Sequence, residues 1–269
     1  MSDTFWSTEL LSFLGGVIDR AKPLRVVFDF DNTLVRNDFG EAVMNELLRQ
    51  GLPWISDIRP FFPEPETADR LEKLRKTDPS TFQKEAWAVY DTIHETKGLE
   101  VAYRWSTWIF SGRSNLELRK TARQIWEQNQ SSETKISVKP YRALYELTLA
   151  LQSINTDIWI VTASPEGVIR EVSGRWNIPE NRVLGVELAE QEGVLSHQVV
   201  EPFTYGAGKV RKIMKATNGE GYDISFGDTE NDFALLENSK LRGIFLDRGK
   251  GKIPPVGSLI QSILDWPVL

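Results

Sequence analysis

Short apolar runs and amphipathic stretches alternate along most of this chain. Five apolar runs of strand length predict β-strands: Arg25–Phe30, Asp157–Thr162, Val183–Leu188, Tyr222–Phe226 and Arg242–Leu246. Helical patterns follow or separate the later runs: Tyr141–Gln152, Glu166–Trp176, Gly208–Ala216 and Asn231–Asn238. Strands that alternate with helices imply βαβ units, so we predict an α/β fold with a parallel sheet and helices on both faces.

The interval between the first two strands is far longer than one crossover needs. Five helical patterns fill most of it: Asp38–Gln50, Glu64–Thr77, Ser80–Thr96, Leu99–Phe110 and Ser114–Gln130. Ser114 and Glu117 predict a capping box at the last of these, and the Pro-rich segment 53–65 is interpreted as a connection. We predict a mainly helical domain over residues 36–139, inserted into a core of residues 1–35 and 140–269.

Two smaller features complete the pattern. The turn Glu190–Gly193 and the segment Val194–Val200 predict a β-hairpin. Near the N-terminus, apolar residues recur at helical spacing: Leu10, Leu11, Phe13, Leu14, Val17 and Ile18. Asp3 and Glu9 stand where a signal peptide would carry positive charge, so we expect an amphipathic helix that packs on the core.

Composition narrows the class of protein. Of 269 residues, 41% are hydrophobic and 26% charged, as in a globular protein with a sizeable core. A formal charge of −6 without a basic stripe argues against a nucleic-acid partner. No apolar run approaches the roughly 20 residues that span a bilayer. The chain has no cysteine, which excludes disulfides and thiolate chemistry. We predict a cytoplasmic protein with no membrane partner; nothing in the sequence indicates an oligomeric state.

Candidate catalytic residues lie at three strand ends and one helix start. The first strand leads into Asp29-Phe30-Asp31-Asn32-Thr33, and the second ends in Thr162. Lys209 follows a Gly-rich turn, and the fourth strand leads into Gly227-Asp228 and then Asp232. Open α/β sheets build their sites at the carboxyl ends of strands. One acidic pair is a weak signal, but four pieces in this order favour a single site.

This set resembles the haloacid dehalogenase (HAD) superfamily, whose pattern is D-x-D-x-T, a strand ending in Thr or Ser, a Lys, and G-D-x-x-x-D. All four elements are present between residues 25 and 247. The insertion point matches the phosphoserine phosphatase-like and phosphorylcholine phosphatase-like subgroup. The resemblance implies a Rossmann-like core with a helical cap, and Mg²⁺-dependent hydrolysis of a phosphomonoester through an aspartyl-phosphate.

A phosphate monoester resists attack because its oxygens are negative, so its hydrolysis needs a nucleophile, gathered positive charge and a proton donor. By the resemblance, Asp29 would be the nucleophile, Asp31 the general acid and base, Thr162 a phosphoryl ligand and Lys209 a fixed positive charge. Mg²⁺ would be held by Asp29, Asp31 through its carbonyl, and Asp228, with Asp232 as an accessory ligand. Phosphate contacts would come from Phe30, Asn32, Thr33, Ala163 and Asn231.

The sequence departs from the family in one place. Thr162 is followed by Ala163-Ser164-Pro165, where phosphoserine phosphatases commonly have glycines. We expect this change to narrow the pocket and leave the reaction itself intact.

The clues to the substrate disagree. Asp38 has the same offset from the nucleophile as the acidic residue that meets the substrate amine in phosphoserine phosphatases, and Glu41 lies one turn beyond. Five tryptophans could build the core of the insert or a wall for a cation: Trp54, Trp87, Trp105, Trp108 and Trp126. These features suit an amine-bearing metabolite such as phosphocholine, phosphoethanolamine or phosphoserine. Arg113 could instead recognise a carboxylate or second phosphate, or simply lie at a helix start.

Other functions stay open beside the phosphatase. A phosphotransferase or mutase of the same superfamily would use the same residues with another acceptor. Dehalogenation would dispense with the metal constellation that Asp31 and Asp228 suggest. A non-catalytic binding protein with this fold would be expected to have degraded motifs, and these motifs are intact.

Overall fold

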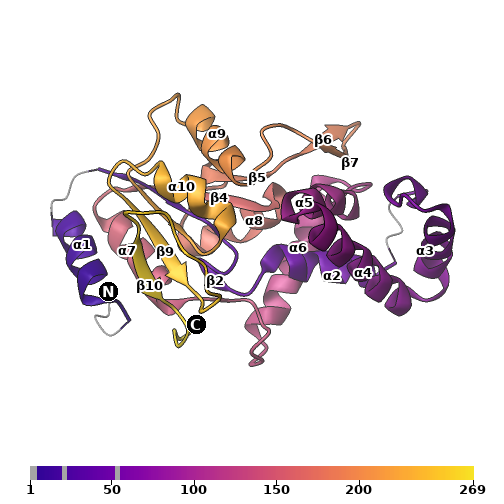
Figure 1. Ribbon diagram of the computed structural model, residues 1–269, viewed down its shortest axis with the longest axis horizontal. Coiled ribbons are helices and arrows are strands. Elements are labelled where there is room, and N and C mark those ends of the chain that lie inside the picture. The colour runs from indigo at the N-terminus through magenta and orange to yellow at the C-terminus, as the bar shows by residue number, and fades with distance from the viewer. Residues whose placement is uncertain (1–4, 20–22, 52–54) are drawn as a thin grey trace.

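The computed structural model describes residues 5–19, 23–51 and 55–269. A six-stranded sheet lies at its centre, in the order β10-β9-β8-β1-β4-β5 (Figure 1). Its strands are β1 (Arg25–Phe28), β4 (Asp157–Pro165), β5 (Val183–Val186), β8 (Ile224–Gly227), β9 (Arg242–Asp247) and β10 (Leu259–Ser262). All five neighbouring pairs are parallel. The predicted α/β fold with a parallel sheet is therefore confirmed, and β10 is a strand that the sequence patterns had not indicated.

Helices cover both faces of the sheet. Successive side chains of a strand point to opposite faces, so neighbouring residues of one strand are buried in different layers. Val26 and Phe28 pack on the face covered by α1 (Thr8–Asp19), α7 (Arg142–Ser153) and α8 (Glu166–Ser173). Val27 packs on the other face, under α9 (Ala207–Ala216) and α10 (Phe233–Glu237). This double burial is why the central strands consist of nearly continuous apolar residues.

We call residues 36–139 the helical insert; in the part of it that the structure describes, there are five α-helices. They are α2 (Phe39–Arg49), α3 (Pro65–Thr77), α4 (Pro79–Lys97), α5 (Leu99–Ser106) and α6 (Asn115–Gln130). In Figure 1, α3, α4 and α5 extend away from the sheet. The capping box of Ser114 and Glu117 is confirmed. Within the Pro-rich connection, Pro53 lies outside the described residues, and Arg59–Phe61 forms a short 3₁₀ helix.

The chain enters and leaves the helical insert through two adjacent short strands. β2 (Val35–Arg36) pairs antiparallel with β3 (Lys139–Pro140). The two ends of the insert are thereby tied together beside the end of β1. These strands fall at the predicted boundaries of the helical domain, while the division into two domains stays a prediction.

Two further elements match the sequence patterns. β6 (Leu188–Gln191) and β7 (Val194–Val199) form the predicted hairpin, and Leu195 exchanges backbone hydrogen bonds with the insert at Gly112 (2.7 Å) and Arg113 (2.8 Å). α1 buries its apolar side and packs near β10, as predicted for the N-terminal helix, whereas Asp3 lies outside the described residues. Among the described residues, no helix has both the length and the apolar character needed to cross a bilayer.

Candidate active site

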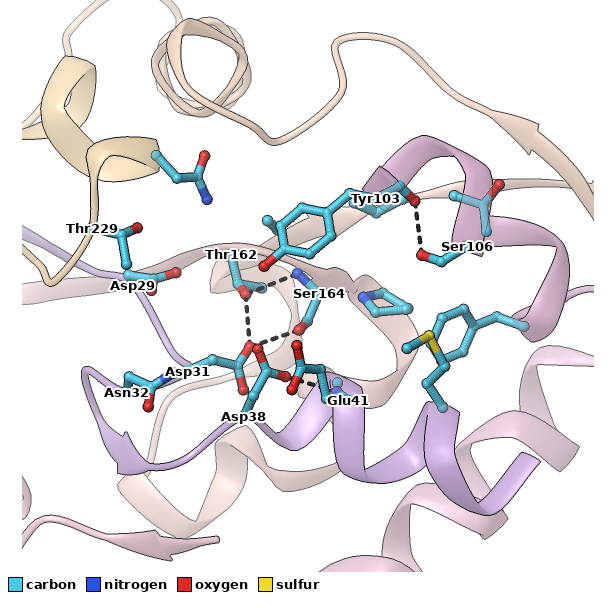
Figure 2. Close-up of a pocket in the computed structure, with 18 of the residues that line it drawn as sticks. Asp29, Asp31, Asn32, Asp38, Glu41, Tyr103, Ser106, Thr162, Ser164 and Thr229 are labelled. Atoms are coloured by element: carbon cyan, nitrogen blue, oxygen red, sulfur yellow. Dashed lines mark hydrogen bonds between the residues drawn. The ribbon is translucent and has the colours of Figure 1, made fainter. Parts of the chain in front are cut away.

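The carboxyl ends of three neighbouring strands bring the predicted residues together. β1 lies between β8 and β4, and all three run in the same direction. Asp29 and Asp31 follow β1, Thr162 lies in β4, and Asp228 follows β8. These four residues line one cavity of about 90 Å³ between the sheet and the helical insert; Figure 2 labels three of them, Asp29, Asp31 and Thr162. Segments more than a hundred residues apart in sequence thus contribute to a single site.

Lys209 supplies a buried positive charge beneath the cavity. Its ammonium group donates to Asp29 Oδ1 (2.8 Å) and Asp232 Oδ1 (2.6 Å), and its side chain is inaccessible to solvent. Burial acts to lower the pKa of Lys209, but the two carboxylates raise it above its ordinary value. Gly208 permits this helix start, because a Cβ there would overlap the carbonyl oxygen of Phe203. The lysine therefore stays charged beside Asp29.

Three buried carboxylates form a candidate metal centre. One oxygen each of Asp29, Asp228 and Asp232 lies within 4.8 Å of the others. Asp232 Oδ2 accepts from the backbone N–H groups of Asp228 and Thr229 (3.1 Å each). Burial, with repulsion from Asp232, raises the pKa of Asp29 to about 7 although Lys209 opposes the shift. Oxygen ligands that repel one another in a buried place suit a hard divalent cation.

Asp228 has two further contacts that hold its side chain. Thr33 donates its hydroxyl to Asp228 Oδ1 at 3.3 Å. The Nε atom of Arg248 lies 2.7 Å from Asp228 Oδ2, as an ion pair that is not aligned for a hydrogen bond. Arg248 also donates from Nη1 to Asn32 Oδ1 (2.6 Å), which ties the loop after β9 to the loop after β1.

The Asp31 carboxyl is held at both oxygens. Asp31 Oδ1 accepts from the backbone N–H of Phe39 at 2.6 Å. Asp31 Oδ2 accepts from the hydroxyls of Ser164 (2.6 Å) and Thr162 (3.4 Å) (Figure 2). Burial and repulsion from Asp38 raise the pKa of Asp31 to about 7. A carboxyl with a pKa near neutrality can both give and take a proton.

The helical insert forms the opposite wall of the cavity. Asp38 and Glu41 lie at the start of α2, and Tyr103 faces them from α5 (Figure 2). Tyr90 and Phe110 complete an aromatic surface. Burial, with repulsion from Glu41, raises the pKa of Asp38 to about 8, and burial raises the pKa of Glu41 as well. Among the described residues that line the cavity there is no lysine, arginine or histidine.

The other predicted residues fall into two groups. Asn32, Ala163 and Asn231 line the cavity, and Asn231 Oδ1 accepts from Gly206 N–H at 2.6 Å just before Lys209. The side chains of the second group, which are those of Phe30, Thr33 and the described tryptophans of the insert, do not line the cavity. The Phe30 ring packs against Phe39 and Trp176 in the core. Thr33 contacts Asp228 instead, and the insert tryptophans within the described residues pack in or against the hydrophobic core.

Arg113 is not brought to the cavity. Its side chain is buried within the insert, where Nη2 donates to the carbonyl oxygen of Ile109 (3.4 Å). Burial lowers the pKa of Arg113 to about 9. The sequence had left two roles open for Arg113, recognition of an anionic group or a place at a helix start, and the structure places its side chain away from the cavity. Trp54, another candidate for the cavity wall, lies outside the described residues.

Several lining residues had escaped sequence reasoning: Gly40, Met44, Tyr90, Tyr103, Ser106, Thr107, Phe110, Val186, Leu188 and Thr229. Ser164 had been noted only as a departure from the family pattern. Strand periodicity could have placed it, because residues 162 and 164 of one strand point to the same face. No local pattern marks Tyr90 or Tyr103, since their position depends on how α4 and α5 pack.

The comparisons with known proteins agree with this geometry. A model of haloacid dehalogenase-like hydrolases matches residues 26–237, while no curated protein matches the chain. A conserved protein of unknown function from Anaerococcus prevotii DSM 20548 is similar at 14% identity and a TM-score of 0.70, over 92% of this chain and 87% of that one. A Bordetella pertussis Tohama I protein of unknown function is 15% identical, with a TM-score of 0.64 over 90% and 99% of the two chains.

A substrate-bound phosphoserine phosphatase is also similar, at 14% identity and a TM-score of 0.53 over 89% of this chain and 93% of that one. Identities this low show likeness of fold. The family model does more, because its match spans most of the chain and includes Asp29, Asp31 and Asp228 as well as Thr162 and Lys209. The chain belongs to the haloacid dehalogenase-like hydrolase family.

Proposed function

We infer that this protein is a Mg²⁺-dependent phosphatase that hydrolyses a small phosphomonoester through an aspartyl-phosphate on Asp29. One observation carries the proposal: the Asp29 carboxyl opens into a small cavity while Lys209 and two further buried carboxylates surround it. A carboxylate can attack a phosphoryl group only where positive charge offsets their mutual repulsion. Lys209 supplies part of that charge.

The oxygen ligands around Asp29 fit Mg²⁺. Asp29 and Asp228 would hold it through carboxylates, and Asp31 through its backbone carbonyl. Asp232 belongs to the same cluster, but its oxygens accept hydrogen bonds from Lys209 and from backbone N–H groups. We assign Asp232 chiefly to holding Lys209. When bound, the ion would neutralise charge on the phosphoryl oxygens and so favour attack by an anion.

The protein's own residues would then divide the reaction into two steps. In the first, an Asp29 oxygen bonds to phosphorus, the ester P–O bond breaks, and protonated Asp31 gives its proton to the departing alcohol oxygen. In the second, a water oxygen bonds to phosphorus, the bond to Asp29 breaks, and Asp31 takes the water's proton. The sum is an ester and water converted to an alcohol and inorganic phosphate, with both aspartates restored.

Contacts to the phosphoryl group would come from the residues at the strand ends. Thr162 can turn its hydroxyl from Asp31 to a phosphoryl oxygen over a short distance, because it lines the same cavity. Asn231 and the backbone at Phe30, Asn32 and Ala163 are the other proposed contacts. Thr33, buried against Asp228, is assigned to holding that carboxylate.

We propose that residues 36–139 act as a cap domain that selects an amine-bearing substrate. The wall formed by the insert contains Asp38 and Glu41 beside the rings of Tyr90 and Tyr103, and no cationic side chain of the described residues lines it. A cationic group would relieve the repulsion between the two carboxyls and could rest against an aromatic face. Phosphocholine and phosphoethanolamine fit this wall better than phosphoserine, since none of the described lining residues carries a positive charge that would meet a serine carboxylate.

The test is release of inorganic phosphate from phosphocholine, phosphoethanolamine and phosphoserine, with 3,3-dimethylbutyl phosphate as an uncharged analogue of phosphocholine. We expect Mg²⁺-dependent release that chelator abolishes, and a preference for the two cationic esters. Measuring alcohol and phosphate together detects transfer to an acceptor other than water, because alcohol release would then exceed phosphate release. No hydrolysis of any ester, including p-nitrophenyl phosphate, would overturn the phosphatase proposal.

A further inference from the structure

Ser164 lies at a position from which it can control Asp31. It is two residues beyond Thr162 in β4, and both residues line the cavity. Its hydroxyl donates to Asp31 Oδ2 at 2.6 Å, a much shorter bond than the one from Thr162 at 3.4 Å. Its own backbone N–H donates to Thr162 Oγ1 (3.1 Å), and its side chain is buried. Ser164 is therefore the principal side-chain donor to the Asp31 carboxyl.

Two glycines next to Ser164 leave space around it that a larger residue at either position would occupy. Gly40 lies in the first turn of α2, and a Cβ added there would overlap the Ser164 hydroxyl and come within 3.0 Å of its Cβ. On the other side, a Cβ at Gly185 of β5 would lie 2.7 Å from the Ser164 carbonyl oxygen. A serine between two glycines is thus held in one place relative to both the sheet and the insert.

Asp31 is consequently fixed from two directions. Its Oδ1 accepts from Phe39 N–H at the start of α2, and its Oδ2 accepts from Ser164 at the end of β4. With one of these bonds removed, the carboxyl could rotate about its side-chain torsions. Misplacement of a catalytic group by about 1 Å can cost on the order of 10²-fold in rate.

We propose that Ser164 is a positioning residue that holds the Asp31 carboxyl where the leaving oxygen departs. The proposal rests on the proposed phosphatase function, in which Asp31 gives that oxygen its proton. It goes beyond the family pattern, since phosphoserine phosphatases commonly have glycine in this segment. Ser164 acts on the reaction through Asp31, so its effect depends on how much the leaving group needs a proton.

The experiment compares kcat/KM for an alkyl ester and for p-nitrophenyl phosphate in Ser164→Ala. Alkoxides need a proton to depart, whereas p-nitrophenolate leaves without one. We expect the alkyl-to-aryl ratio of kcat/KM to fall about tenfold or more, because general acid catalysis contributes roughly 10²–10⁴-fold. A purely structural role for Ser164 would lower both values together and leave the ratio at its wild-type value, which would overturn the proposal.

A second variant displaces the Ser164 hydroxyl without removing it. Gly40→Ala keeps Ser164 but places a methyl group where its hydroxyl lies, so the ratio should fall as it does in Ser164→Ala. In Gly40→Ala/Ser164→Gly the overlap is removed but the donor is absent, so the thermal stability should recover while the ratio stays low. The cycle is completed by Ser164→Gly alone. A ratio in the double variant equal to the product of the two single effects would contradict the proposal, because contacting residues should couple.

Failure of this inference is distinguishable from failure of the proposed function. If the wild-type protein releases no phosphate from any ester, the phosphatase proposal fails, and with it the role of Ser164. If the wild-type protein hydrolyses both esters and neither variant changes the ratio, the phosphatase stands and the positioning role is wrong. Thermal unfolding of each variant identifies one that has not folded, and the other variant then decides.

Discussion

The two walls of the cavity are built in different ways. On the sheet side, Asp29, Thr162 and Asp228 lie in or just beyond three neighbouring strands that backbone hydrogen bonds hold in register. On the insert side, Tyr90 and Tyr103 come from α4 and α5, and their places depend on ring packing. Their ring centroids lie 6.4 Å apart, and Tyr103 also meets Tyr205 of the sheet side at 5.9 Å. Backbone geometry fixes one wall, and side-chain packing fixes the other.

The walls also differ in how their negative charge is balanced. Asp29 has Lys209 at 2.8 Å, and Asp228 has Arg248 at 2.7 Å. Asp38 and Glu41 have no comparable partner among the described lining residues, and the pKa values of both are raised. In the described part of the chain, the sheet wall thus balances its carboxylates with its own cations, whereas the insert wall leaves two carboxyls that a cationic substrate could balance. If this division is correct, substitutions on the two sides should change different kinetic quantities.

The largest effect should come from the nucleophile. Asp29→Asn removes the attacking anion with little change in volume, so we expect kcat to fall by about 10⁴-fold or more for every ester. Phosphate release measures this, and thermal unfolding checks that the variant folds. Asp69→Asn, on the exposed surface of α3, is the matched control and should keep wild-type activity. An active Asp29→Asn variant would refute the assignment.

The next effect concerns the candidate metal ligands. Asp228→Asn should raise the Mg²⁺ concentration for half-maximal activity by about 10²-fold or more, since loss of even an outer-shell partner typically costs 10–100-fold. Calorimetric titration with Mg²⁺ measures the same loss without activity. Glu230→Gln is the control, because Glu230 is two residues away yet pairs with Lys252 on the surface. Equal Mg²⁺ affinity in both variants would remove Asp228 from the metal site.

The preference for a cationic ester over an uncharged one should change only when residues of the insert wall are substituted. In Glu41→Gln, kcat/KM for phosphocholine should fall about 10-fold, as expected when a charged partner contributing roughly 1.5 kcal/mol is lost. The value for 3,3-dimethylbutyl phosphate should change much less, because that ester carries no cation. Glu46→Gln, on the same helix but outside the cavity, should change neither. Parallel losses on both esters would mean that Glu41 does not recognise charge.

The contrast between the walls explains what the sequence could predict. The apolar runs indicated the strands and therefore where Asp29, Thr162 and Asp228 would meet, because strand ends in a parallel sheet share one edge. The positions of Tyr103 and Arg113 depend on helix packing, which leaves no short-range pattern. The sequence thus left open a substrate contact for Arg113, whose side chain is buried elsewhere, and it gave no sign of the tyrosines. β10 was not predicted because it lies at the sheet edge. Alternate residues there, such as Ile260, remain exposed, so the strand lacks a continuous apolar run.

The smallest effect expected is on stability, and it isolates Asp38. Its pKa is raised from 3.8 to about 8, so between these values the folded protein binds a proton that the unfolded chain releases. Stability should therefore fall as pH rises from about 4 to 8. Asp38→Asn keeps an N-cap acceptor for Glu41 N–H but cannot ionise.

With chelator present and no substrate, we expect the wild-type protein to lose about 2–4 °C more in Tm than Asp38→Asn between pH 5 and 8. Burial of Asp29 and Asp31 contributes equally to the change of Tm with pH in both proteins. The difference in Tm change between the two proteins therefore reports on Asp38 and its repulsion with Glu41. Asp69→Asn should follow the wild-type curve. Parallel curves for the wild type and Asp38→Asn would mean that the insert wall carries no unbalanced charge. The reason for expecting a cationic substrate would then be lost, while the chemistry at the strand ends would be unaffected.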